Sequence, residues 1–123
     1  MPKPTRGGRT AANRLPNHAK AVFPKNKFKN YLLNPSKEPN KSRVFKQIGY
    51  TMKNSDRLEA DMRKGLKENK ATVFNPNKYG TPAQVEMVLG IDKQRKMVTA
   101  WMIDKGTKIP RFVTAYPAEE VKE

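Results

Sequence analysis

Cysteine is absent from this sequence of 123 residues, which excludes disulfide bonds and thiolate metal sites. Long apolar runs are also missing. The longest, from Val98 to Ile103, is interrupted by Thr99 and is far shorter than the about 20 residues of a membrane-spanning helix. The first residues contain no apolar stretch of the kind found in signal peptides, so none is predicted. We expect one small soluble domain with a modest core.

Acidic residues are scarce, above all in the first part of the chain. Lys and Arg number 26 against 11 Asp and Glu, a net charge of +15. Residues 1–50 carry +11 with Glu38 as their single acid, and residues 51–123 carry only +4. Such a surface gains affinity for nucleic-acid phosphates by releasing condensed counterions, and RNA is the favoured partner. A merely solvated basic surface stays open as an alternative. An anionic membrane is less favoured as the partner, because the sequence contains no basic amphipathic helix with an aromatic face.

Composition divides the chain into three parts. Residues 1–20 combine proline, glycine and scattered basic residues with few large apolar ones, which predicts a flexible basic leader. A single domain is expected over residues 21–118, followed by a tail over residues 119–123.

Apolar spacing predicts helices first and strands afterwards. The three expected helices run from about Pro24 to Leu33, from about Asn40 to a C-cap at Gly49, and from an N-cap at Asn54 or Ser55 to about Asn69, with Leu58, Met62 and Leu66 as a buried stripe. Alternation predicts strands over residues 85–91, 96–104 and 111–116. We therefore expect an α+β domain whose N-terminal helices pack on one face of a C-terminal antiparallel sheet.

Strand alternation also assigns residues to the two faces of this sheet. If Val98, Ala100 and Met102 face the helices, then Thr99 and Trp101 face away. The same reasoning places the following residues on the open face: Phe112, Thr114, Tyr116 and Glu86. An open face rich in aromatic and hydroxyl groups suits base stacking and phosphate contacts. The alternative is that these aromatics complete a second core layer, since a shift of one residue inverts every assignment.

Short runs of the sequence resemble the C-terminal toxin domains of bacterial polymorphic toxins. The runs are KFKNYLLNP (27–35), KSRVF (41–45), GY (49–50), TAW (99–101) and PRFVTAYP (110–117), and the resemblance extends over roughly residues 15–117. These toxins include tRNA-cleaving domains of contact-dependent growth inhibition (CdiA-type) proteins, similar to the barnase/EndoU/colicin/RelE (BECR) ribonucleases. The resemblance implies a BECR-like fold with its site on the exposed sheet face. It also implies a ribonuclease that acts on tRNA.

Ribonuclease chemistry without a metal needs no cofactor, because the neighbouring 2′-hydroxyl is the nucleophile. It requires a base, an acid and cations for the developing phosphorane charge. Lys41 matches the lysine at the start of the toxins' second helix and is a candidate phosphate ligand, as is Arg111 with its forked guanidinium. Thr114 and Tyr116 are candidates for hydrogen bonds to phosphate or 2′-hydroxyl, and Glu86 is a candidate base. A metal-dependent mechanism is disfavoured, since the acids gather mostly on the third helix as a solvated face.

Substrate binding has its own candidates. Arg43, Lys46 and Lys27 are expected to hold phosphates, and Thr99 and Trp101 to contact RNA on the open face. The single histidine, His18, is a natural acid or base at neutral pH, but it lies in the predicted leader and is also explained as a solvated residue.

The resemblance further implies an acidic immunity protein as partner. The domain would be secreted or delivered from a cell surface as part of a larger toxin, and would act in the cytoplasm of the target cell. Two alternatives stay open: a non-catalytic basic module that binds RNA or DNA, and a structural or phage-packaging protein with a basic arm.

Overall fold

A computed structural model describes residues 8–10, 14–24 and 27–118. The helical elements are two 3-10 turns, η1 (His18–Lys20) and η3 (Met52–Asn54), a π-helical turn, η2 (Phe28–Leu32), and two α-helices, α1 (Pro39–Gln47) and α2 (Ser55–Glu68). The strands are β1 (Gly8–Thr10), β2 (Ala71–Phe74), β3 (Gly80–Leu89), β4 (Arg95–Asp104) and β5 (Pro110–Pro117). They form one antiparallel sheet in the order β1-β2-β3-β4-β5.

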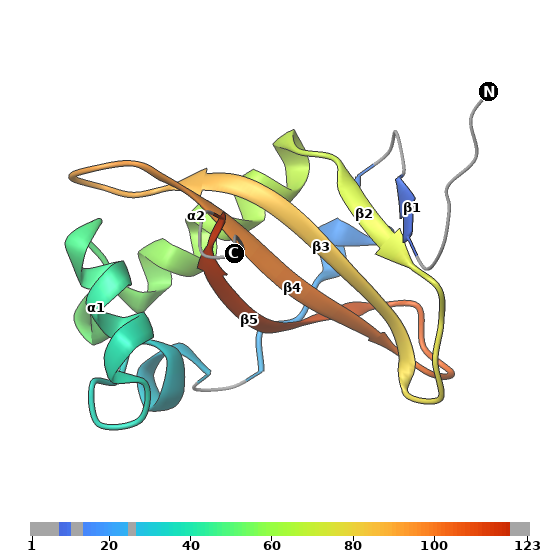
Figure 1. The fold of residues 1–123 in the computed structure, drawn as a ribbon, viewed down its shortest axis with the longest axis horizontal. Helices are drawn as coiled ribbons and strands as arrows, with labels where there is room; N and C mark the ends of the chain where they lie inside the picture. Colours follow the sequence, from blue (N-terminus) through green and yellow to red (C-terminus); the bar gives the residue numbers. More distant parts are fainter. Residues whose placement is uncertain (1–7, 11–13, 25–26, 119–123) are drawn as a thin grey trace.

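The predicted α+β architecture is confirmed. α2 lies behind the sheet and α1 stands beside one end of it, so the helices of the described residues leave one sheet face uncovered (Figure 1). In the described part of the chain, no helix is long and apolar enough to cross a membrane.

Local sequence signals explain where the helices begin and end. Pro39 occupies the first position of α1, where its missing N–H costs nothing, and Gly49 follows the helix at φ 106°. Asn54 precedes α2 as predicted, but its side chain does not cap α2. Its Oδ1 instead accepts a hydrogen bond from the N–H of Thr51, and its Nδ2 donates to the carbonyl of Gly49. The loop between α1 and α2 is thereby fixed.

The buried face of α2 is the predicted one. Leu58, Met62 and Leu66 are all completely buried. On its exposed faces, Arg57 pairs with Asp61, and Arg63 pairs with Glu59, each four residues away. The acids of this helix are therefore partly neutralised by their own helix, as the sequence suggested.

The predicted leader is too long. Leu15 is only 1% exposed and belongs to the core, and Val22 forms a parallel bridge with Arg111 at the edge of β5. The domain therefore includes residues 14–20. Apolar residues are too few in this segment for periodicity to reveal that it packs. The rest of the predicted leader, apart from β1, and the predicted tail lie outside the described residues.

The face assignment of β4 is wrong. The residues that face the helices are Met97, Thr99 and Trp101, and not Val98, Ala100 and Met102. Thr99 pairs with Val85, whose side chain lies in the core, and residues opposite each other in a sheet share a face. The core takes the large indole, and the hydroxyl of Thr99 is satisfied by donating to the carbonyl of Val85.

The face assignment of β5 is half right. A register irregularity opposite Ala100 and Trp101 breaks the alternation, so that both Phe112 and Ala115 point into the core. Phe112 was expected on the open face, whereas it packs at 5.4 Å between ring centroids from Trp101. Because the irregularity precedes Thr114, that residue and Tyr116 still lie on the predicted open face.

Candidate functional site

Four polar side chains lie together on the open face of the sheet. Gln84 and Glu86 alternate along β3 with buried residues, and Thr114 and Tyr116 flank the buried Ala115 on β5. In the strand register Gln84 and Thr114 both lie opposite Ala100, and Glu86 and Tyr116 both lie opposite Val98. The four side chains therefore occupy two neighbouring rows across the sheet. We call them, together with Lys41, the open-face cluster.

Helix α1 supplies the cation of this cluster. The Nζ atom of Lys41 donates a hydrogen bond to Oγ1 of Thr114 at 3.0 Å. Lys41 lies in the first turn of α1, whose burial of Phe45 fixes the helix against the core. Because an ammonium group has three protons, two remain for a ligand. The sequence predicted both residues but not their contact.

Tyr116 is oriented by Gln84. The amide Nε2 of Gln84 donates to the phenol oxygen of Tyr116 at 3.2 Å. Both hydroxyl oxygens of the cluster thus accept a hydrogen bond from a neighbour, which leaves the hydrogens of Thr114 and Tyr116 for another acceptor. With Lys41 they provide three donors on one surface, an arrangement suited to the oxygens of a phosphate.

Two of the predicted substrate contacts do not lie on this face. Thr99 is completely buried and Trp101 is 1% exposed, and the indole Nε1 of Trp101 donates to Oγ1 of Thr99 at 2.8 Å. Neither side chain reaches a ligand bound at the open face. Their assignment to RNA contact is corrected: both belong to the core, for the reason of register given above.

Arg111 is engaged elsewhere. Its Nε and Nη2 donate to the two carboxylate oxygens of Asp104 at 2.6 and 3.0 Å. The hydrogen bond from Arg111 holds the pKa of Asp104 below its usual value. Arg111 precedes Thr114 by three residues on β5, but its fork is occupied, so a two-point contact with phosphate requires this ion pair to open.

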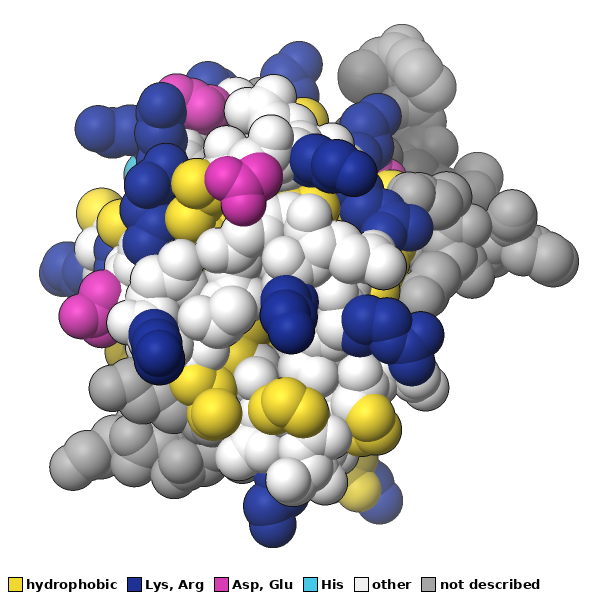
Figure 2. Space-filling view, turned by 90° about the vertical axis from the view of Figure 1, so that its left-hand side faces the viewer, with side chains coloured by type: hydrophobic (Ala, Val, Ile, Leu, Met, Phe, Trp, Pro, Cys, Tyr) yellow, Lys and Arg dark blue, Asp and Glu magenta, His cyan; other side chains and the backbone are white. Residues whose placement is uncertain are grey.

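The other predicted cations lie on α1 and at the start of η2. Arg43 and Lys46 are exposed, and Nη2 of Arg43 donates to Oδ1 of Asn40 at 3.0 Å. Lys27 lies over the ring of Tyr31, with 5.0 Å from Nζ to the ring centroid. Figure 2 shows the side of the molecule that carries α1 and the β3–β4 turn, where Lys and Arg are spread widely and acidic side chains are few. Among the described residues, none of the three makes a hydrogen bond or ion pair with the open-face cluster, and their role in binding phosphates stays a prediction.

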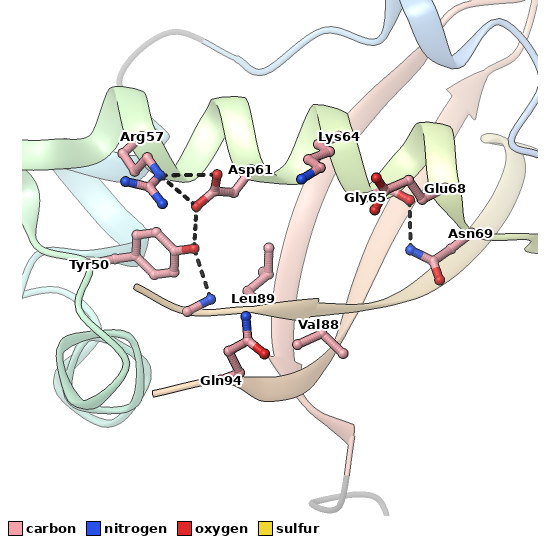
Figure 3. A pocket seen from close by; sticks show the side chains of 11 residues that line it. Tyr50, Arg57, Asp61, Lys64, Gly65, Glu68, Asn69, Val88, Leu89 and Gln94 are labelled. Atoms are coloured by element: carbon pink, nitrogen blue, oxygen red, sulfur yellow. Dashed lines mark hydrogen bonds and ion pairs between the residues drawn. The ribbon is translucent and has the colours of Figure 1, made fainter. Parts of the chain in front are cut away.

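A cleft of about 560 Å³ lies on the other side of the sheet, between α2 and the end of β3 (Figure 3). The phenol of Tyr50 donates to Oδ2 of Asp61 at 2.6 Å and accepts from the N–H of Gly90 at 2.9 Å, and Arg57 holds the same carboxylate. Burial and the hydrogen bond to Asp61 raise the pKa of Tyr50 above its ordinary value. The polar groups of Tyr50, Asp61, Arg57 and the Gly90 N–H thus satisfy one another, which is typical of a structural tie. Across the described ranges, His, Asp and Glu side chains form no group of three or more that could hold a metal ion.

The family model described as "Domain of unknown function (DUF6883)" matches residues 14–119, which include every helix and the strands β2 to β5. The chain belongs to the DUF6883 family. No curated protein and no solved structure matches it. The open-face cluster lies wholly within the part of the chain that the family model covers.

One member of the site in this DUF6883 domain was not among the sequence candidates. Gln84 orients Tyr116, and its outward position was predictable from the alternation along β3. Its partner was not predictable, because β4 separates the two strands and the register across it could not be read from the sequence.

The tie at Tyr50 leads to a stability prediction for the DUF6883 domain. Tyr50→Phe removes the group that satisfies both the Asp61 carboxylate and the N–H of Gly90, so we expect the free energy of unfolding to fall by about 1–3 kcal/mol. Because the pKa of Tyr50 is raised in the folded state, the unfolded chain loses this proton first as the pH rises above about 10. The wild type should therefore lose stability there more steeply than Tyr50→Phe, by up to about 1.4 kcal/mol per pH unit. Urea denaturation from pH 7 to 11 measures both, and equal slopes would contradict the burial of this phenol.

Proposed function

We propose that this domain is a metal-independent endoribonuclease whose site is the open-face cluster, and that its substrate is tRNA. The observation that carries the proposal is the contact between Lys41 and Thr114 beside Tyr116 and Glu86. The sheet face that the described helices leave uncovered carries a cation, two hydroxyl groups and a carboxylate, which supports the proposal. The resemblance of the sequence to polymorphic toxin domains supports the same reading.

The proposed reaction is attack of the 2′-hydroxyl oxygen on the adjacent phosphorus. The bond from phosphorus to the 5′-oxygen breaks, which leaves a 2′,3′-cyclic phosphate and a 5′-hydroxyl end. Glu86 accepts the proton of the 2′-hydroxyl and Tyr116 gives a proton to the departing 5′-oxygen. Lys41 and Thr114 bind the non-bridging oxygens, where negative charge grows in the transition state.

The positions of these groups suit their roles. Glu86 and Tyr116 lie in the same row, separated by β4, so their backbones are about 10 Å apart and their long side chains can approach one phosphate from opposite sides. Lys41 contacts Thr114, two residues before Tyr116 on the same strand, so the cation lies on the same side of the sheet as the proposed acid. Arg43, Lys46 and Lys27 hold the rest of the RNA backbone in this proposal.

The proposal extends to the biological setting. The domain is a toxin carried by a larger protein that is secreted or displayed on a cell surface, and it acts in the cytoplasm of the target cell. An acidic immunity protein neutralises it, because opposite charge accelerates association with a domain of net charge +15.

Incubation with tRNA in excess EDTA tests the proposed activity. We expect discrete fragments whose ends are 2′,3′-cyclic phosphate and 5′-hydroxyl, detected by gel electrophoresis and end-specific labelling. The matched control is a DNA oligonucleotide with the sequence of the same tRNA, which offers the same phosphates but no 2′-hydroxyl. We expect it to bind without cleavage.

The other outcomes decide among the alternatives. Intact tRNA with retarded mobility would identify a non-catalytic RNA-binding module. Intact tRNA without retardation at moderate salt would reject the ribonuclease and the RNA-binding module together. Cleavage that EDTA abolishes would reject the metal-independent mechanism.

A further inference from the structure

A small basic hollow lies between η1 and the solvent side of α2. Its volume is about 260 Å³, and its lining consists of His18, Ala19, Arg63, Lys64 and Lys67. Four of these five side chains are cationic or can become so, and none is acidic. The hollow is smaller than the about 300–1,000 Å³ of sites for drug-sized ligands, so it fits a phosphate group with part of its sugar.

The hollow lies on the far side of α2 from the sheet. The residues of α2 that face the sheet are Leu58, Met62 and Leu66, and successive helical residues rotate by about 100°. Lys67 consequently projects away from the sheet, and Lys64 stands at the border between the two depressions, where it lines both this hollow and the cleft beside β3. The hollow is thus separated from the open-face cluster by both the helix and the sheet.

The turn that carries His18 is fixed. Asn17 has the left-handed backbone conformation at φ 57°, and its Nδ2 donates to the carbonyl of Lys108 at 2.6 Å. The N–H of Ala21 donates to the carbonyl of His18 at 3.1 Å, which closes the turn. Because Leu15 anchors the preceding residues in the core, the histidine is held beside α2.

The cations of the hollow differ in what they contact. Arg63 donates to Glu59 through Nε and Nη2 and to the carbonyl of Ala21 through Nη1, so three of its five N–H groups are used. Lys64 and Lys67 make no ion pair with any residue that the structure describes. Two lysines three residues apart on a helix repel each other, and an anion between them relieves that repulsion.

We propose that this hollow is a second phosphate-binding site, in which His18, Lys64 and Lys67 bind one phosphate and Arg63 lies at the edge of the site. The site takes a backbone phosphate of an RNA that is long enough to reach around the molecule from the open-face cluster. The assignment of the bound phosphate to RNA rests on the proposed function. The binding of phosphate itself rests only on the cations of the hollow.

The single histidine makes the site observable. In wild-type protein at pH 7 and constant ionic strength, we expect inorganic phosphate to shift the ring signals of His18 in a ¹H–¹³C NMR spectrum with saturation, while sodium chloride does not. The double variant Lys64→Gln/Lys67→Gln should lose this shift. Lys53→Gln/Lys93→Gln removes the same charge at two exposed lysines elsewhere and should keep it. No saturable shift in the wild type, or an equal shift in the Lys64/Lys67 variant, would overturn the site.

A second arm separates RNA from free phosphate as the source. A 2′-O-methylated RNA of tRNA length cannot undergo attack by its 2′-oxygen, and we expect it to shift the His18 signals at phosphate concentrations at which inorganic phosphate and a 2′-O-methylated dinucleotide leave them unchanged. In Lys64→Gln/Lys67→Gln the slope of log affinity for the long RNA against log salt concentration should become shallower by about one to two units. A shift with phosphate but none with the long RNA would overturn the RNA assignment.

The same samples distinguish this inference from the proposed function. The Lys64/Lys67 variant should cleave an unmodified dinucleotide at the wild-type rate, because that substrate occupies only the open-face cluster. A wild type that binds phosphate at His18 but cleaves no RNA would retain the phosphate site and reject the ribonuclease. A wild type that cleaves RNA but shows no change at His18 with phosphate would retain the ribonuclease and reject the phosphate site.

Discussion

Lys41→Met should lower the rate of RNA cleavage by about 10²–10³-fold while the domain stays folded. The expected loss is that of a donor which stabilises transition-state charge. Methionine keeps much of the aliphatic length of lysine, so the packing of α1 beside the sheet is preserved. Single-turnover cleavage of a labelled tRNA measures the rate, and circular dichroism verifies the fold.

Two matched variants show whether the effect belongs to the site. Lys53→Met removes the same charge at an exposed position on η3 and should change the rate less than threefold. Thr114→Ala removes the hydroxyl that Lys41 contacts and should slow cleavage about tenfold or more, whereas Thr114→Ser should restore most of the rate. If Lys41→Met and Lys53→Met cleave equally fast, the open-face cluster is not the active site.

Trp101→Ala should lower the free energy of unfolding by about 3–5 kcal/mol. The indole is buried, its ring meets Phe23 and Phe112 with centroids 5.4 Å away in each case, and its N–H is satisfied by Thr99. Since a domain of this kind is stable by about 5–15 kcal/mol, a large part of its stability would be lost. Urea denaturation measures the change.

An exposed aromatic provides the comparison. Tyr79 is 65% exposed at the β2–β3 turn, and Tyr79→Ala should alter stability by less than about 0.5 kcal/mol. The fluorescence of Trp101, the single tryptophan, gives a second readout: it should resist quenching by acrylamide, with or without bound RNA. Strong quenching in the free protein, together with a small stability loss in Trp101→Ala, would show that Trp101 lies at the surface and contradict its burial.

The helical half of the fold was largely predictable from the sequence. Three apolar residues at spacings of four determine the buried face of α2, and Pro39 and Gly49 mark the limits of α1 through backbone geometry that few other residues provide. Such signals are local. The packing of Leu15 was missed because one apolar residue among prolines and basic residues gives no period.

The sheet shows where sequence reasoning stops. Alternation gave the face of Glu86 correctly because β3 has a continuous buried series, whereas β4 mixes apolar residues on both faces, so nothing in it shows whether Val98 or Thr99 points inward. The irregularity beside Thr114 depends on pairing with β4, which no single strand encodes. The hydroxyl and charged members of the site were therefore found, while Trp101 was placed on the wrong face.

The bridge between Val22 and Arg111 has a consequence for biosynthesis. The segment around Leu15 and Val22 packs beside α2, but its backbone bridge at Val22 requires β5, which is the last strand to leave the ribosome. The helices and the β2–β4 meander join neighbours in sequence and can form early, but this closure spans almost the whole domain and comes late. A nascent chain that lacks β5 has neither Phe112 to pack against Phe28 nor Thr114 to contact Lys41. We therefore expect the proposed catalytic surface to assemble only when translation of the domain is complete, so that partly made chains are inactive.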